Sequence, residues 1–186
     1  MGVLHITSGR LKGRKLRSPE GTKTRPLLTR LRKSLADILR PRLAGARVLD
    51  LFGGSGAVGF ELLSNGASSA VLVEISSATA ELIRQNARDL NILADVKAFQ
   101  GDGIEAVSRL AGQEEEFDVI VVAHPYGRGL QQSAIDELGA HRVLAANGVI
   151  IVQREHREPV PEPSGQLRFV HTRNYGRTAF DFYEKV

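Results

Sequence analysis

Apolar runs alternate with amphipathic stretches along most of this chain, from residue 46 to residue 186. Each apolar run has the length of a buried strand, and most are followed by apolar positions at helical spacing. This alternation predicts an α/β fold with a parallel sheet and helices on both faces. The expected strands are 46–52, 69–75, 96–102, 117–123, 147–155, 166–176 and 178–186. The expected helices are 76–92, 103–110 and 130–144, and residues 53–66 are expected to run from a glycine turn into a further helix.

The first 44 residues have a different pattern and are expected to form a small extension to a domain of residues 45–186. Two short segments, 3–6 and 14–17, are expected to pair as a hairpin. A helix is expected to begin at Pro26, where the missing N–H costs nothing, and to end at Pro41. Its apolar positions are 27, 28, 31, 35, 38 and 39.

Charge is divided unevenly along the chain. Residues 1–47 contain 13 Lys and Arg against two acids, a net of +11, whereas residues 48–186 contain 12 against 19, a net of −7. A basic arm on an acidic body predicts a polyanionic partner, most simply nucleic acid. The alternative is a solvated arm without a partner. The residues expected to contact RNA phosphates are Arg10, Lys12, Arg14, Lys15, Arg25, Arg30 and Arg32.

Composition excludes several kinds of site. The 186 residues include no cysteine, which excludes disulfides, thiolate zinc sites and a cysteine nucleophile. The histidines are scattered without metal-ligand spacing, so we expect no metal. No apolar run has the length of a membrane span, and the N-terminus lacks the pattern of a signal peptide. We expect a cytoplasmic, monomeric protein.

A glycine-rich turn, DLFGGSGAVG at 50–59, follows the first strand of the main domain and opens a helix. Such a turn lets a ligand approach the backbone and the positive end of the helix. Glu74 and Asp102 end the next two strands, and the three segments should meet at one edge of a parallel sheet. This arrangement predicts a nucleotide-like cofactor. Helix N-capping is the alternative role for Glu74 and Asp102.

The glycine spacing fits neither a dinucleotide G-x-G-x-x-G turn nor a P-loop, which needs a following Gly-Lys-Ser/Thr. Asp50 favours a ligand that carries an amine or a cation. The pattern resembles the S-adenosylmethionine site of Rossmann-like class I methyltransferases, whose seven-stranded sheet ends in a reversed hairpin. Asn86, on the helix after Glu74, is expected to be a structural cap or a surface amide. The resemblance implies cofactor contacts from Asp50, Phe52, Gly54, Gly56, Glu74 and Asp102.

A narrower family resemblance extends from residue 5 to the end of the chain. Its segments are RLKGRKLRSPEGTKTRP, VLDLFGGSGAVGFELLSNGA, VLVE, FDVIVVAHPY and RNYGRTAFDFY. In order and spacing they resemble the RsmD-type 16S rRNA guanine-N2 methyltransferases. The resemblance implies methyl transfer from S-adenosylmethionine to the exocyclic amine of one guanine, in 16S rRNA or in a small-subunit assembly particle.

Two segments depart from that family's pattern. Thr29 and Lys33 replace an Asp and a Glu on the first helix, which makes the helix more basic. The family's catalytic loop reads Asp/Asn-Pro-Pro-aromatic. The corresponding residues here are Ala123, His124, Pro125 and Tyr126. By resemblance this loop holds the target base, with backbone carbonyls that accept hydrogen bonds from the amine and Tyr126 stacked on the ring.

Ala123 lacks the side-chain acceptor of the family. A charge-assisted hydrogen bond is worth about 1.5–3 kcal/mol, so its loss predicts a reaction roughly ten- to hundredfold slower. Loss of a proton acceptor would slow it by a further ~10²–10⁴-fold. His124 is expected to replace a proline rather than the acceptor, because adjacent strand residues point to opposite sides. Two hypotheses follow: an impaired methyltransferase, or a non-catalytic RNA-binding relative with the same fold.

Overall fold

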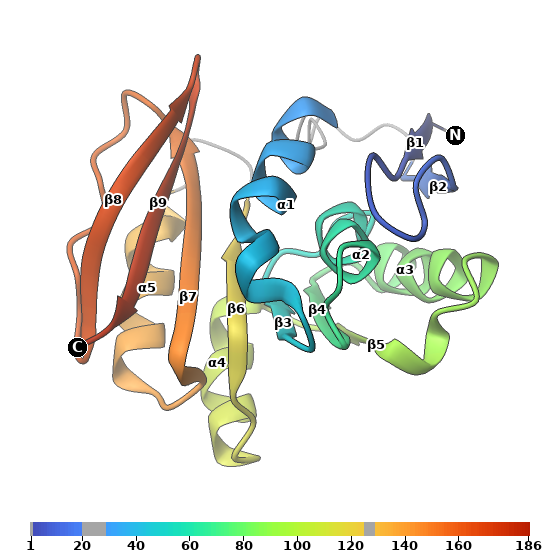
Figure 1. Cartoon of the computed structure of the whole chain (residues 1–186). Coiled ribbons are helices and arrows are strands. Elements are labelled where there is room, and N and C mark those ends of the chain that lie inside the picture. The colour runs from blue at the N-terminus through green and yellow to red at the C-terminus, as the bar shows by residue number, and fades with distance from the viewer. Residues whose placement is uncertain (1, 20–28, 125–128) are drawn as a thin grey trace.

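The computed structural model describes residues 2–19, 29–124 and 129–186, which are arranged around a seven-stranded sheet. The strand order is β5-β4-β3-β6-β7-β9-β8 (Figure 1). The five strands β3 to β7 are parallel to one another, whereas β9 pairs antiparallel with both β7 and β8. The expected α/β fold with an antiparallel finish is therefore confirmed. The strands are β3 Arg47–Asp50, β4 Ser69–Glu74, β5 Val96–Gln100, β6 Phe117–Val122, β7 Leu144–Glu155, β8 Leu167–Tyr175 and β9 Thr178–Lys185.

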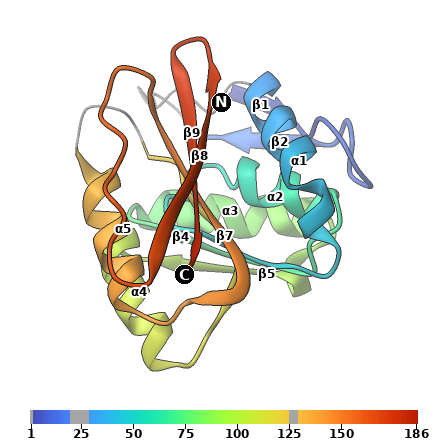
Figure 2. The same cartoon turned by 60° about the vertical axis from the view of Figure 1, so that its left-hand side comes forward.

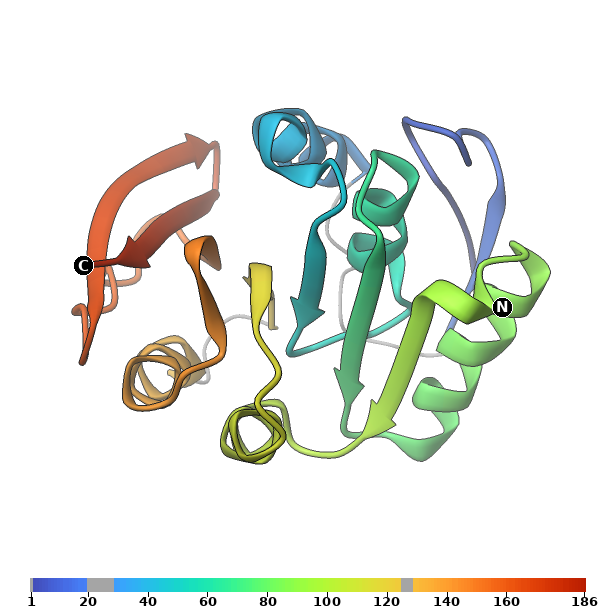
Figure 3. The ribbon, with the colours of Figure 1, turned by 60° about the horizontal axis from the view of Figure 1, so that its bottom comes forward.

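Helices cover both faces of this sheet (Figure 3). One hydrophobic cluster joins α1, α2 and α3 to one face, and a second joins α4 and α5 to the other. Strand β6 divides its side chains between them, because Val119 and Val121 lie in the first cluster and Ile120 and Val122 in the second. The helices are α1 Thr29–Leu43, α2 Ala57–Ser64, α3 Ser77–Asp89, the short 3-10 helix η1 Leu93–Asp95, α4 Gly103–Gly112 and α5 Leu130–Ala140.

Two expected helix ends are wrong. Helix α1 continues through Pro41 to Leu43, because proline in a last turn removes a single backbone bond while Leu43 is completely buried. Helix α5 ends at Ala140 rather than at residue 144, since His141 is extended and Leu144 already pairs with Phe117 as the first residue of β7. The expected start of α1 at Pro26 lies outside the described residues.

The expected N-terminal hairpin is present as β1 Gly2–His5 and β2 Lys15–Ser18, paired antiparallel. Its buried residues Ile6, Leu11 and Leu16 belong to the same cluster as α1, α2 and α3. Four-residue strands bury too little apolar surface to be stable alone. The hairpin therefore depends on its contacts with the helices beside it (Figure 2).

A buried carboxylate anchors this hairpin. Glu61 of α2 is 1% exposed, and its Oε1 accepts hydrogen bonds from the N–H and hydroxyl groups of Thr7 and Ser8 at 2.7–3.1 Å. Arg32 of α1 lies beside it, with Nε 3.9 Å from Glu61 Oε2 and Nη2 donating to the His5 carbonyl at 2.9 Å. One polar network thus joins the hairpin, α1 and α2.

We predict that Glu61→Gln lowers the free energy of unfolding by about 3 kcal/mol or more, because the change removes a negative charge beside a buried guanidinium. The control is Glu81→Gln on α3, whose exposed carboxylate pairs with Arg84 and Arg88. Exposed pairs contribute less than about 1 kcal/mol. Urea unfolding of both variants measures the difference, and equal losses would contradict the role given to Glu61.

Candidate functional site

The glycine-rich turn links the end of β3 to the start of α2. Gly56 is the N-cap of α2 with φ +81°, and a Cβ there would lie 2.5 Å from Phe60 Cε2. Gly53 N donates to the Val73 carbonyl at 2.8 Å, which holds the turn against β4. Because α2 follows β3, the backbone N–H groups at its start lie at the carboxyl edge of the sheet.

Asp50 is the last residue of β3 and lies beneath this turn. Its side chain is 1% exposed, and Oδ1 accepts from Phe52 N at 3.2 Å. Burial raises the pKa of the Asp50 carboxyl to about 7, and the negative charge of Glu74 adds to this rise, while the hydrogen bond from Phe52 opposes it. An anion buried in this way is stabilised by a cationic ligand group.

Glu74 ends β4 and Asp102 follows β5, at the same edge of the sheet. Glu74 Oε2 accepts from Gly54 N at 3.0 Å and Oε1 from Ser76 N at 2.9 Å, while Ser76 itself is the N-cap of α3. Asp102 is the N-cap of α4 and uses Oδ1 for both capping bonds. The capping role considered for Asp102 is thus confirmed, and Glu74 fixes the glycine turn as well as the entry to α3.

The glycine after Asp102 brings this third segment close to the first. A Cβ on Gly103 would lie 2.0 Å from the Leu51 carbonyl oxygen, so the backbones approach there as only glycine permits. The order β5-β4-β3 then places Asp102, Glu74 and Asp50 on three neighbouring strand ends. Their convergence at one edge is the geometry expected for a ligand site in a parallel sheet.

The loop after β6 borders the same edge. Ala123 packs beside the first hydrophobic cluster, whereas His124 is buried and contacts the ring of Phe52 edge-on, with centroids 5.3 Å apart. His124 is therefore an interior residue that joins the loop to the glycine turn, which proline at this position could not do. Pro125 and Tyr126 lie outside the described residues.

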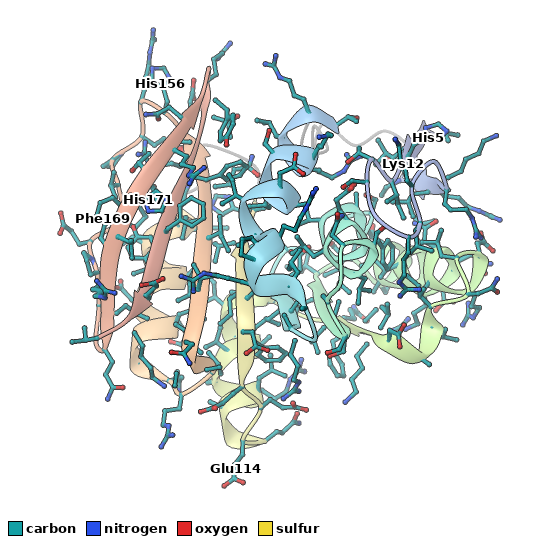
Figure 4. All side chains as sticks on the ribbon, viewed as in Figure 1. His5, Lys12, Glu114, His156, Phe169 and His171 are labelled. Atoms are coloured by element: carbon teal, nitrogen blue, oxygen red, sulfur yellow. The ribbon has the colours of Figure 1, made fainter. Side chains whose placement is uncertain are left out.

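The basic residues of the extension differ in what they contact. Arg10 pairs with Asp95 at 3.4 Å, and Arg14 donates to the Asp89 carbonyl at 2.7 Å. Lys12, labelled in Figure 4, has an exposed side chain, as do Lys15 and Arg30. Arg25 lies outside the described residues.

Arg32 requires a correction, because the expected phosphate contact is incompatible with its burial beside Glu61. Its position among Leu31, Leu35 and Leu39 gave one signal of burial, since residues three and four apart share a helix face. The other signal was Glu61 itself, an acid within the apolar stretch AVGFELL.

Asn86 was expected to be a structural cap or a surface amide, but it links two distant segments of the chain. It is buried, Nδ2 donates to the carbonyls of Arg17 at 2.9 Å and Ser55 at 3.1 Å, and Oδ1 accepts from Arg17 N at 2.9 Å. The surface-amide alternative is wrong. One side chain of α3 connects β2 of the basic extension to the glycine turn.

Two further kinds of site are absent from the described part of the chain. Within residues 2–19, 29–124 and 129–186, no group of three or more His, Asp or Glu is placed to hold a metal ion. None of the helices in these ranges is long and apolar enough to cross a membrane.

Comparison with known proteins places this geometry in a family. The family model described as conserved hypothetical protein 95 matches residues 4–184. Ribosomal RNA small subunit methyltransferase D of Escherichia coli K12 is 31% identical over 99% of this chain and 91% of its own length. The putative rRNA methyltransferase YlbH of Bacillus subtilis is 28% identical over 98% of this chain and 99% of its own.

Solved structures agree with the sequence relatives. A putative methyltransferase from Escherichia coli superposes with a TM-score of 0.85 at 28% identity, covering 99% of this chain and 98% of that one. A hypothetical protein of Thermus thermophilus has a TM-score of 0.82 at 30% identity, over 99% and 100% of the two chains. The chain has the class I methyltransferase fold and belongs to the conserved hypothetical protein 95 family, which is the RsmD methyltransferase family.

Proposed function

We propose that this chain is an S-adenosylmethionine-dependent methyltransferase that acts on the exocyclic N2 of a guanine in 16S rRNA of the small ribosomal subunit. The observation that carries the proposal is the buried Asp50 carboxylate, which lies next to Glu74 at the edge where the glycine turn begins α2. A ligand with a cationic amine and ribose hydroxyls complements that pair. When bound, the cofactor supplies a methyl group on a positively charged sulfur.

Each strand end has a separate part in holding this cofactor. Asp50 accepts hydrogen bonds from the ammonium group, and the backbone at Gly54 and Gly56 lies close to the ligand. Glu74 uses one lone pair of each oxygen for Gly54 N and Ser76 N, and each oxygen has another for a ribose hydroxyl. Asp102 caps α4 through Oδ1, so we assign Oδ2 to a donor of the cofactor. Phe52, fixed by His124, forms an apolar wall.

The basic extension of residues 1–44 is the proposed RNA-binding part, with residues 45–186 as the cofactor-binding domain. Lys12, Lys15 and Arg30 are exposed and can neutralise phosphates without specifying sequence. Arg10, Arg14 and Arg25 complete the proposed set. We propose 16S rRNA or a small-subunit assembly particle as the partner of a monomeric, cytoplasmic enzyme.

The target base must leave its stack and present its amine to the methyl group. We assign the His124 carbonyl to one N–H of the amine and Tyr126 to the face of the ring. Ala123 supplies no side-chain acceptor, which favours a second candidate: a catalytically weak or inactive RNA-binding relative that keeps the fold. Both candidates share the cofactor and RNA surfaces and differ in the rate of transfer.

We predict that Asp50→Asn weakens binding of S-adenosylhomocysteine about ten- to hundredfold, because a neutral amide replaces a charged acceptor. Isothermal titration calorimetry measures this affinity. The control is Asp118→Asn, which changes an acid on β6 at the opposite edge, where Oδ2 accepts from Arg47 N. Equal affinities for the Asp50 variant and the unmodified chain would contradict the assignment.

The same variant should be more stable than the unmodified chain at high pH. Because the pKa of Asp50 in the fold, about 7, exceeds its ordinary value of 3.8, ionisation opposes folding. This cost is absent below pH 4, grows between pH 4 and 7 and is complete above pH 7. Thermal melts at pH 5 and pH 8 measure the stability of the Asp50→Asn variant relative to the unmodified chain. This stability difference should be larger at pH 8. Its upper limit is about 4 kcal/mol, because each unit of the pKa difference is worth about 1.4 kcal/mol. An advantage that does not change with pH would contradict it.

We predict that Ala123→Asp increases methyl transfer to unmethylated 30S subunits by tenfold or more, at about 1.4 kcal/mol for each factor of ten. The new carboxylate restores an acceptor for the guanine amine. Initial rates of tritium incorporation provide the measurement. Ala146→Asp, which adds the same charge at an exposed position near the start of β7, is the control and should leave the rate unchanged. Equal rates for the Ala123 variant and the unmodified chain would show that the acceptor is dispensable.

A further inference from the structure

The face of the β8–β9 hairpin that is turned toward α1 carries a row of aromatic and basic side chains. His171, Arg173 and Tyr175 alternate along β8 and therefore share a face. His171 stacks on Phe182 with centroids 4.5 Å apart, and Tyr175 meets Phe180 edge-on at 5.7 Å. Both phenylalanines belong to the cluster that contains α1, so the row faces that helix.

A hollow of about 160 Å³ separates the row from α1. Ile38, Leu39 and Arg42 line it on the helix, and Val170, His171 and Arg173 line it on β8. Glu184 also reaches the hollow, but it pairs with Arg42 at 2.6 Å and with Arg168 at 2.8 Å. Two guanidinium groups thus pair with one carboxylate, and Arg173 adds a further positive charge to the lining, which leaves the surface positive. His171 and Arg173 are exposed, and Figure 4 labels His171 on the hairpin.

The row leads to the proposed active-site edge. Thr178, at the tip of the hairpin, pairs with Glu155, the last residue of β7, so the tip lies beyond the carboxyl ends of the parallel strands. Figures 1 and 2 both place this tip at the same end of the molecule as the β1–β2 hairpin. The loop that follows β6 leaves the sheet at that edge.

A buried ion pair holds the hairpin in place. Arg154 Nε lies 2.5 Å from Asp181 Oδ2, and Arg154 Nη1 donates to the carbonyls of His156 at 3.0 Å and Glu158 at 2.8 Å. Thr172 Oγ1 donates to Asp181 Oδ1 at 2.6 Å, which ties β8 into the same network. A surface fixed in this way loses little conformational freedom when a ligand binds.

We propose that this row, His171, Arg173 and Tyr175, is a second RNA-contacting surface, which holds an unpaired strand that runs toward the active-site edge. Arginine neutralises phosphates, and aromatic rings stack on unpaired bases without sequence preference. The row supplies both in alternation, while the hollow beside it accommodates part of a nucleotide. The inference rests on the proposed function and adds a contact on the other side of α1 from the β1–β2 hairpin (Figure 1).

The test compares Arg173→Glu with Arg142→Glu in binding to protein-free, unmethylated 16S rRNA. Arg142 is 82% exposed and follows α5, away from the hairpin tip, so it provides the same charge change elsewhere. Arg173→Glu is expected to weaken binding about tenfold and to reduce the slope of log K against log salt by roughly one unit. Arg142→Glu should change affinity less than twofold, and neither variant should alter S-adenosylhomocysteine affinity.

Crosslinking locates the contact directly. With 4-thiouridine-substituted rRNA, photocrosslinks are expected in the peptide 169–177 of the unmodified chain. Equal effects of the two charge reversals, with no crosslink in this peptide, would overturn the inference and leave the proposed methyl transfer untouched. A defect of Arg173→Glu confined to 30S particles, with normal affinity for bare rRNA, would also overturn it, by indicating a protein contact. If the unmodified chain transfers no methyl group but Arg173→Glu alone loses RNA affinity, the proposed function fails and the second RNA-contacting surface is still supported.

Discussion

The parallel register of the central strands is the constraint from which the rest of this site follows. Because β3 pairs in parallel with both β4 and β6, the segments after these strands emerge at one edge. The glycine turn, Glu74 and the loop that begins at Ala123 therefore converge although they are far apart in sequence. The contacts of Gly53 N with the Val73 carbonyl and of His124 with Phe52 then fix the segments against each other.

Two buried carboxylates use this framework in opposite ways. Glu61 is surrounded by donors from Thr7 and Ser8 and lies beside Arg32, so its charge contributes to the attachment of the basic extension. Asp50 has one described hydrogen bond, from Phe52 N, and burial raises the pKa of its carboxyl. The first arrangement favours stability. The second costs stability in the free protein, and a cationic ligand offsets that cost, as is common at functional sites.

Features that depend on neighbours in the chain could be predicted from the sequence. The strands, the glycine turn and the final pair of strands all follow from local patterns. Features that depend on distant partners could not. Burial of Arg32 requires Glu61, the role of Asn86 requires Arg17 and Ser55, and the interior position of His124 requires Phe52. Helix α1 passes Pro41 because Leu43 packs in the core, which no local signal indicated.

Ala123 is the residue that separates the two proposed functions, since the proposed cofactor edge and RNA surfaces would serve an active enzyme and a binding relative alike. The most direct measurement is incubation of this chain with unmethylated 30S subunits and S-adenosylmethionine that carries a deuterated methyl group, followed by mass spectrometry of the rRNA nucleosides. The proposed function predicts deuterated N2-methylguanosine from a single 16S rRNA site. Label in another nucleoside, or no label from a chain that binds the cofactor, would contradict it.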